Sequence, residues 1–342
     1  MDNNIAIPFI ISAAISFLIT PVVKRIAIIC GAMDMPKDDR RIHKRPMPSM
    51  GGLAIYISIV LVSLIFIPMD RSLLATIIGG TVILVSGIID DIWDLSPKGK
   101  LLFQIAAAIV LILGDVRIMG ITNPFSKTLE IIPLNSLSIP ITIFWVVGIT
   151  NTVNLIDGLD GLAAGVTMIA SLSFLMVAIR FGYISIIIMS ATVAGACLGF
   201  LPYNFNPATI FMGDTGALFL GFILSALSIE GVMKSVATIA IVVPILILGV
   251  PIFDTTLAIF RRLLSGRSIA EADDGHLHHK LLRMGYSQRK TVIILYIISA
   301  IFGLCATLIA RINSKGAVIL STMVFAVALL LANELGLIGS RR

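Results

Sequence analysis

Three aspartates close a long apolar run in the stretch GIIDDIWD, residues 87–94. Asp90 and Asp94 are four residues apart and share one face of a helix, where like charges repel by about 0.2–0.5 kcal/mol per pair. Capping of the helix expected to start near Lys98 would account for one of these acids but not for three. Divalent cations such as Mg²⁺ bind carboxylate and phosphate oxygens, usually through one or two carboxylates together with the substrate. The stretch therefore indicates a metal-binding or proton-transfer role.

A second group of polar residues lies in the stretch NTVNLIDGLDGLAAG, residues 151–165. Asn154, Asp157 and Asp160 recur at every third position, which predicts that they lie roughly along one side of a helical turn. The interspersed glycines leave the backbone open to close approach by a ligand. A polar turn between two spans is the alternative, but it would require neither this spacing nor two acids. The pattern therefore favours a functional site.

The stretch NPATIFMGDTGALFLG, residues 206–221, places Asp214 and Thr215 at the start of an expected helix. Free backbone N–H groups and the positive end of the helix dipole favour a phosphate at such a position. The alternative is that Asp214 or Thr215 only caps the helix. The two interpretations are compatible, because a capping position is also well placed to hold a metal-bound pyrophosphate.

Three of the four histidines lie in DDGHLHHKLLRMG, residues 273–285, at His276, His278 and His279. At this spacing the three rings cannot all face one zinc ion, and no cysteine assists them. Contacts with substrate phosphate or sugar oxygens are the preferred interpretation, and a solvated loop with incidental histidines is the alternative.

The stretch DMPKDDRRIHKRPMPSMGG, residues 34–52, contributes cations. Its prolines and paired glycines predict a stiff loop, on which Lys44 and Arg45 suit a phosphate. Arg40 and Arg41 are better explained as a topology signal.

The composition predicts an all-α, polytopic membrane protein. Of the 342 residues, 58% are hydrophobic and 13% are charged, whereas a soluble domain averages about 45–50% apolar and roughly 25% charged residues. The net charge of +6 does not require a nucleic-acid partner, because retention of lysine and arginine in cytosolic loops explains it. Cys30, Cys197 and Cys305 are too dispersed to suggest disulfides or a zinc site.

About eleven spans are expected, because each needs roughly 20 mostly apolar residues. The N-terminal run lacks the cationic start of a signal peptide and is kept as a span. Pro244, Gly249 and Pro251 are expected to kink or break the ninth span. The expected spans are 5–23, 51–69, 72–89, 101–114, 137–153, 162–180, 184–201, 215–232, 235–256, 291–310 and 316–336.

The distribution of charges predicts the orientation. Eighteen lysines and arginines fall on one side of the expected spans and seven on the other, which predicts an outer N-terminus and a cytosolic C-terminus. Fourteen of the nineteen acids also fall inside or at inner helix ends. The chain is expected to form one domain, 1–342, with cytosolic active-site loops at 31–50, 90–100, 154–165, 202–216 and 257–290. Acids for a metal and basic residues for phosphates on one membrane face describe phosphoryl transfer between a cytosolic nucleotide and a lipid substrate.

The chain resembles the polyprenyl-phosphate N-acetylhexosamine-1-phosphate transferases, a family that includes the phospho-MurNAc-pentapeptide translocases. The resemblance runs from about residue 30 to 290 and rests on HKRPMPSMGG, GIIDDIWD, NLIDGLDGLAAG, IFMGDTGALFLG and GHLHHKL, five motifs in order. It implies transfer of N-acetylglucosamine-1-phosphate from UDP-GlcNAc to undecaprenyl phosphate, with release of UMP. It further implies Mg²⁺, with Mn²⁺ as a substitute, a bacterial cell (inner) membrane location, a homodimer as one assembly, and the first membrane step of a cell-envelope polysaccharide or teichoic acid pathway.

The resemblance also implies roles for individual residues. Asp90, Asp91 and Asp157 are expected to be catalytic, with the first two acting on the lipid phosphate. Asp214 is the expected Mg²⁺ ligand, with Asn154 close to it. The expected substrate contacts are Lys44, Asp160, His276, His278 and His279.

Two departures from the pentapeptide translocases favour the GlcNAc branch. Position 94 is Asp where those enzymes carry a lysine, and the histidine motif reads His276-Leu277-His278-His279 rather than three consecutive histidines. No role is assigned to Asp94. The alternatives are another UDP-N-acetylhexosamine, such as UDP-MurNAc-pentapeptide, and, in other functional classes, an ion-coupled transporter or a scaffold. A transporter would carry its acids near the bilayer midplane, whereas the middle regions of these expected spans contain almost none.

Overall fold

Long apolar runs form helices here because a helix satisfies its own backbone polar groups within lipid. The computed structural model describes residues 5–35, 46–122, 131–233, 241–264, 266, 275–312 and 314–334. Within these ranges, eight helices are long and apolar enough to cross a membrane, two of them together with an adjoining 3₁₀ or π turn. They are α1 (Ala6–Cys30), α3 (Arg71–Trp93), α5 (Ser138–Ile156), α6 (Leu162–Phe181), α7 (Ile184–Asn204), α8 (Gly213–Ser228), α12 (Gln288–Ile309) and α13 (Ser314–Glu334).

Shorter helices occupy the other expected spans. These are α2 (Gly52–Phe66), α4 (Pro97–Leu113), and the pair α9 (Val242–Ile247) and α10 (Gly249–Leu264). The interruption between α9 and α10 confirms the break expected in the ninth span. The prediction of an all-α polytopic membrane protein is confirmed. Eleven crossings require α2, α4 and the α9–α10 pair to span as well, so that count and the orientation stay predictions.

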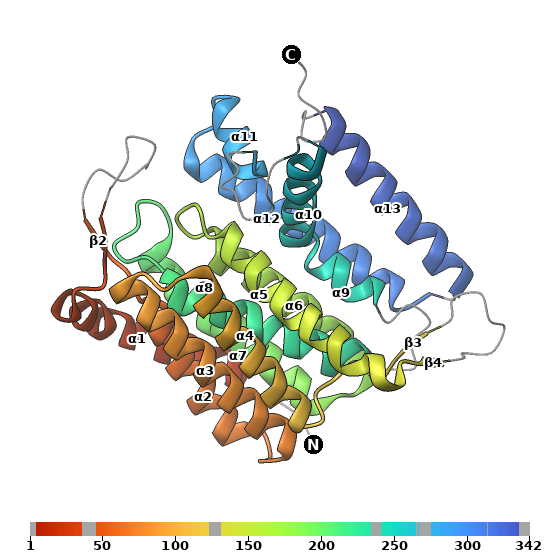
Figure 1. Ribbon diagram of the computed structural model, residues 1–342, viewed down its shortest axis with the longest axis horizontal. Helices are drawn as coiled ribbons and strands as arrows, with labels where there is room; N and C mark the ends of the chain where they lie inside the picture. The colour runs from red at the N-terminus through yellow and green to blue at the C-terminus, as the bar shows by residue number, and fades with distance from the viewer. Residues whose placement is uncertain are drawn as a thin grey trace.

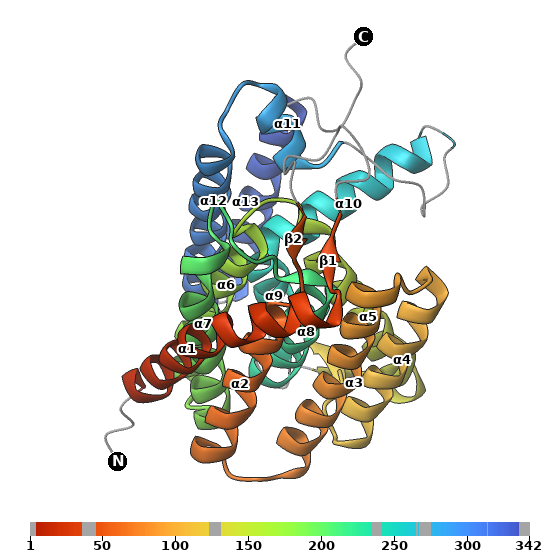
Figure 2. The same ribbon diagram turned by 90° about the vertical axis from the view of Figure 1, so that its left-hand side faces the viewer.

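Small elements join the helices. Strands β1 (Met33–Asp34) and β2 (Met47–Pro48) pair antiparallel, with Met33 opposite Pro48. This pair and helix α11 (Leu277–Arg283) extend from the same end of the bundle, as Figure 2 shows. The remaining elements are the antiparallel pair β3 (Gly120–Thr122) and β4 (Ile131–Pro133), the 3₁₀ turn η1 (Asn135–Leu137) and the π turn η2 (Ile229–Met233).

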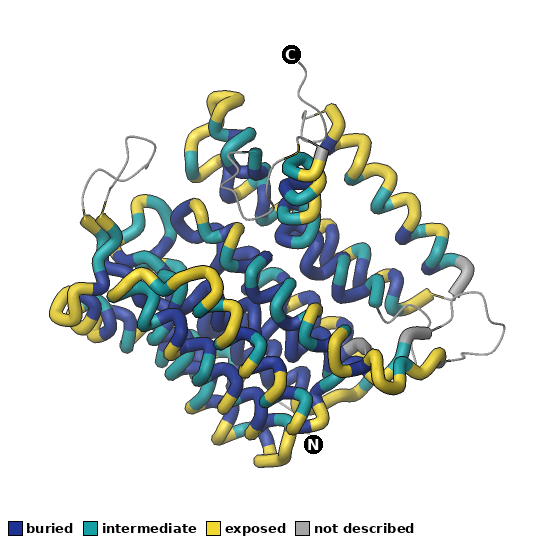
Figure 3. The backbone as a smooth tube through the Cα atoms, in the orientation of Figure 1, coloured by how far each residue is buried: buried dark blue, intermediate teal, exposed yellow. Residues whose placement is uncertain are grey.

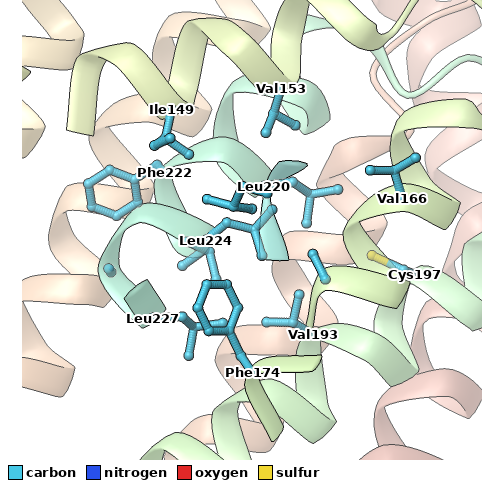
Figure 4. Close-up of a cluster of buried hydrophobic side chains, with 14 of the residues drawn as sticks. Ile149, Val153, Val166, Phe174, Val193, Cys197, Leu220, Phe222, Leu224 and Leu227 are labelled. Atoms are coloured by element: carbon cyan, nitrogen blue, oxygen red, sulfur yellow. The ribbon is translucent and has the colours of Figure 1, made fainter. Parts of the chain in front are cut away.

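Helix α8 forms the centre of the bundle (Figure 1). Every residue of α8 from Thr215 to Ser228 is buried. Phe222, Leu224 and Leu227 of α8 lie in one apolar cluster with residues of α5, α6 and α7, as Figure 4 shows. In contrast, exposed residues line the outer faces of α1 and α13 (Figure 3). Those faces are apolar, with Leu18 69% and Leu330 66% exposed, as expected for surfaces that meet lipid.

Glycines bring α2 and α3 against the start of α8. A Cβ atom on Gly52 would lie 2.0 Å from the Cα of Gly216, and one on Gly87 would lie 2.4 Å from the Cα of Thr215. Only glycine permits such an approach of backbone to backbone. The ends of three helices are thereby drawn together at one end of the bundle.

Candidate active site

The carboxylate of Asp91, near the end of α3, caps the N-terminus of α8. Its oxygens accept hydrogen bonds from the backbone N–H groups of Asp214 (3.0 Å) and Thr215 (3.1 Å). They also accept from the hydroxyls of Thr215 (2.6 Å) and Ser49 (3.1 Å). The cap therefore comes from α3 and not from Asp214 or Thr215, which was the alternative that the sequence left open. An anion already occupies the N–H groups that were expected to favour a phosphate.

Asp214 lies at the centre of a chain of polar contacts that joins four helices. Its Oδ2 is 2.5 Å from the Nζ of Lys100 on α4, and its Oδ1 accepts a hydrogen bond of 2.9 Å from the Nδ2 of Asn154 on α5. The same Nζ of Lys100 lies 2.8 Å from the Oδ2 of Asp90 on α3. The other oxygen of Asp90 accepts a hydrogen bond from the backbone N–H of Leu95. The structure thus brings Asp90, Asn154 and Asp214 together, and their roles stay predictions.

Lys100 is the component of this chain that the sequence analysis missed, because it was counted only as a topology cation. It stands in the first turn of α4, whose N-cap is Ser96. A lysine there opposes the helix dipole. That unfavourable position is the signal that could have marked Lys100 as paired with acids.

Asp157 is the C-cap of α5, so the three-residue period leaves the helix after Asn154. Burial, followed by the charges of Asp214, Asp91 and Asp160, raises the pKa of Asp157 to about 8. Within the described part of the chain no side chain or backbone group donates a hydrogen bond to its carboxylate. A proton or an added cation would therefore stabilise this group.

Asp160 has a different environment from Asp157, although the sequence placed both on one side of a turn. It is only 4% exposed. Its Oδ2 accepts hydrogen bonds of 3.0 Å from the Nδ2 of Asn206 and from the backbone N–H of Ala208. Asn206 also donates to Gln288 at the start of α12. Asp160 thus fixes the segment between α7 and α8 against α12, and its expected nucleotide contact stays a prediction.

The histidines form the start of α11, with His276 as its N-cap and His278 and His279 in its first turn. The Nδ1 of His276 lies 2.9 Å from the Oδ2 of Asp254 on α10. The other oxygen of Asp254 accepts a hydrogen bond of 2.7 Å from the backbone N–H of Leu277. Asp254 is a second residue that the sequence analysis missed, because it lies inside an apolar span. It ties the histidine segment to α10.

His278 packs against the glycine-rich turn. It is 2% exposed, and a Cβ on Gly158 would lie 2.6 Å from its Nε2. The ring stacks on that of His276, with centroids 5.7 Å apart, and contacts that of His279 at 4.2 Å. Burial, with smaller effects from neighbouring charged groups, lowers the pKa of His278 to about 3. His278 is therefore a neutral side chain at physiological pH.

Lys44 lies outside the described residues, but the segment that follows it is anchored at the site. The backbone N–H groups of Gly51 and Gly52 each donate a 2.9 Å hydrogen bond, to the carbonyl oxygens of Phe211 and Met212. The backbone of Phe211 donates in turn to the carbonyl of Pro48. Strand β2 thus leads directly to the residues that precede α8.

The donor atoms at this end of the bundle suit Mg²⁺. Asp90, Asp157 and Asp214 supply carboxylate oxygens and Asn154 an amide oxygen, which are the hard ligands this ion prefers. Among the described residues, no three acidic, histidine or cysteine side chains already converge on one point. Such convergence is not required, because Mg²⁺ usually takes one or two carboxylates and completes its shell with substrate phosphates and water. The raised pKa of Asp157 marks the position where a cation would relieve the crowding of like charges.

Comparison with known proteins shows the family to which the chain belongs. The sequence model described as "Glycosyl transferase family 4" matches residues 73–232. This range contains the polar cluster of Asp90, Lys100, Asn154 and Asp214. A Bacillus subtilis protein named "Probable undecaprenyl-phosphate N-acetylglucosaminyl 1-phosphate transferase" is 45% identical over 306 residues, covering 89% of this chain and 84% of the relative.

Two further relatives carry related names. A Mycobacterium tuberculosis protein named "Decaprenyl-phosphate N-acetylglucosaminephosphotransferase" is 34% identical, over 95% of this chain and 87% of the relative. A Halalkalibacterium halodurans protein named "Phospho-N-acetylmuramoyl-pentapeptide-transferase" is 32% identical, over 89% of this chain and 95% of the relative. Identity at this level along nearly the whole length shows that the chain belongs to the polyprenyl-phosphate N-acetylhexosamine-1-phosphate transferases of glycosyl transferase family 4.

Proposed function

We propose that the protein transfers N-acetylglucosamine-1-phosphate from UDP-GlcNAc to undecaprenyl phosphate, forming undecaprenyl-diphospho-GlcNAc and UMP. The observation that carries this proposal is the junction of Asp90, Lys100, Asn154 and Asp214, contributed by four helices at one end of an apolar bundle. The name of the Bacillus subtilis relative specifies N-acetylglucosamine, which supports the choice of sugar.

The reaction forms one P–O bond and breaks another. An oxygen of the lipid phosphate attacks the β-phosphorus of UDP-GlcNAc, and the bond from that phosphorus to the bridging oxygen breaks, so that UMP leaves. We assign Asp90 and Asp157 to the attacking phosphate, to keep it ionised or accept its last proton. Lys100 contributes positive charge beside Asp90.

For Asp91 we propose a different role from the catalytic one that the resemblance implied. Its carboxylate already accepts four hydrogen bonds at the start of α8. We therefore propose that Asp91 positions Asp214 and does not act on the lipid phosphate itself. Contact with the nucleotide sugar, or its ordering, is proposed for Lys44, Asp160, His276, His278 and His279.

Asp214 and Asn154 are proposed to hold Mg²⁺, for which Mn²⁺ can substitute. The bound ion would neutralise the pyrophosphate of the sugar nucleotide. For Asn154 this requires its amide oxygen, because its nitrogen faces Asp214.

The excess of cations on one side of the spans supports a bacterial inner-membrane location with the site facing the cytosol. A homodimer is proposed by analogy with the family. The second candidate substrate is UDP-MurNAc-pentapeptide, which the name of the Halalkalibacterium halodurans relative favours.

The test is turnover by purified protein in detergent with undecaprenyl phosphate and a panel of radiolabelled UDP-sugars. We expect conversion of UDP-GlcNAc to a lipid-extractable product and UMP. Turnover of UDP-MurNAc-pentapeptide in place of UDP-GlcNAc would select the second candidate. Turnover with no sealed membrane present also excludes a transport activity as the source of the signal.

A further inference from the structure

Gln104 on α4 and Asn151 on α5 form a reciprocal amide pair beneath the polar cluster. The Nδ2 of Asn151 donates a 2.7 Å hydrogen bond to the Oε1 of Gln104, and the Nε2 of Gln104 donates a 3.2 Å bond to the Oδ1 of Asn151. Asn151 also donates to the carbonyl of Val147 one turn earlier in its own helix. Gln104 is 1% exposed. Asn151 is half-buried, and a buried amide such as that of Gln104 is costly unless it is hydrogen-bonded.

The pair lies one helical turn from two residues of the cluster. Gln104 follows Lys100 by four residues, and Asn151 precedes Asn154 by three, so each amide lies on the same face as the residue above it. The axial separations are about 6 Å and 4.5 Å at 1.5 Å per residue. The pair therefore fixes the axial position of α4 relative to α5 at one helical turn from the site.

The two residues above the pair hold opposite oxygens of one carboxylate. Lys100 contacts Oδ2 of Asp214 and Asn154 contacts Oδ1. Because Lys100 and Asn154 come from different helices, both contacts exist only when α4 and α5 have the correct register. A displacement of about 1 Å at a reacting centre can lower a rate about a hundredfold.

We propose that Gln104 and Asn151 are positioning residues, whose reciprocal hydrogen bonds set the register of α4 and α5 so that Lys100 and Asn154 both reach Asp214. This role rests on the proposed function of the Asp214 cluster. Neither residue touches Asp90 or Asp214 itself, so both act through the residues above them.

The variants Gln104→Met and Asn151→Leu keep approximate volume and remove the hydrogen bonds. We expect each to lower kcat, expressed per folded protein, by at least about tenfold, equal to about 1.4 kcal/mol of barrier. The double variant should be no slower than the slower single variant, because each single change already breaks the pair. The exchanged variant Gln104→Asn/Asn151→Gln conserves the total side-chain length across the gap and should recover activity to within about threefold of wild type.

The matched control is the second polar pair of α5, in which the Nε1 of Trp145 donates a 2.8 Å hydrogen bond to the Oγ of Ser228. Ser228→Ala should keep wild-type kcat, because this pair lies farther from the cluster along α5. Thermal unfolding of every variant reports the folded fraction. A pair that is only structural would lower the unfolding temperature and leave kcat per folded protein unchanged.

Turnover is measured with whichever UDP-N-acetylhexosamine the wild-type protein converts best, so a wrong sugar would overturn the proposed function and leave this test valid. Wild-type kcat in both single variants, additive losses in the double variant, or no recovery in the exchanged variant would each overturn the positioning role.

Discussion

The Nζ of Lys100 lies 2.5 Å from the Oδ2 of Asp214, although 114 residues separate them in the sequence. The same Nζ lies 2.8 Å from Asp90. A single cation thus pairs with two carboxylates that would otherwise repel each other. The polar end of the bundle depends on this contact for its arrangement as well as for any chemistry.

Replacement of Lys100 by Met should therefore lower kcat by about a hundredfold or more, since it leaves two like charges without the cation that both contact. The matched control is Lys98→Met, because Lys98 is exposed in the same first turn of α4. Turnover assays on both variants test the prediction. Equal effects at positions 98 and 100 would contradict it.

The two neighbouring aspartates of α3 should fail in different ways when replaced. Asp91→Ala removes the cap of α8 and should lower the free energy of unfolding by about 1–2 kcal/mol as well as the activity. Asp90→Asn should leave stability nearly unchanged and lower turnover strongly. Thermal unfolding in detergent, measured beside turnover, separates the two. An unfolding temperature lowered more by Asp90→Asn than by Asp91→Ala would reverse the assignment.

Metal removal should abolish turnover, and added Mg²⁺ should restore it. Asp214→Asn should lose far more activity than Asp70→Asn, since a lost metal ligand costs several factors of ten. Asp70 is a suitable control because it caps α3 by accepting from the N–H of Leu73, and asparagine caps as well as aspartate. Full turnover in EDTA would remove the metal from the proposal.

Asp157 should make the protein less stable as the pH rises. Its pKa is about 8 in the folded protein and about 3.9 in an unfolded chain. The folded state therefore binds the proton more tightly, and stability is lost between about pH 4 and pH 8. In chelator, Asp157→Asn should raise the unfolding temperature at pH 8.5 more than at pH 5, while turnover falls. An equal shift at both pH values would show that this carboxyl does not titrate in that range.

Gly158→Ala should reduce activity through His278. The new methyl group would lie 2.6 Å from the Nε2 of that buried ring, so the ring or the turn must move. Gly148→Ala in α5 is the control, because a Cβ there meets no atom within 4 Å and alanine favours a helix. Turnover of the two variants, each compared with wild type, tests the contact. Wild-type kcat for Gly158→Ala would show that the position of His278 does not matter.

The fold class and much of the site were predictable because their signals are local. Long apolar runs mark helices in lipid, and Asp90, Asn154 and Asp214 stood out as polar residues at the ends of such runs. Proline and glycine predicted the break between α9 and α10. These patterns need no knowledge of which helix packs against which.

The missed parts depend on contacts between distant segments. Asp91 caps α8 only because Gly87 lets α3 approach Thr215, and no local pattern reports a cap supplied by another helix. Lys100 resembled the other loop cations until its acidic partners were known. The period of three in 151–165 predicted a helical turn that continues beyond the end of α5. Periodicity alone does not show where a helix ends, and Asp157 is the non-helical C-cap.

The burial of α8 on every side also bears on how the protein enters the membrane. Its span has a mean hydropathy of 1.3, the lowest of the eight candidate spans in the described part of the chain, and 83% of an 18-residue stretch within it is buried, against 17% for α13. A helix of low hydropathy partitions weakly into lipid from the translocon. Insertion of α8 should therefore depend on earlier helices, such as α3 and α5, that are already in place to receive it. The helix that carries Asp214 would then enter the bilayer as part of an assembling bundle.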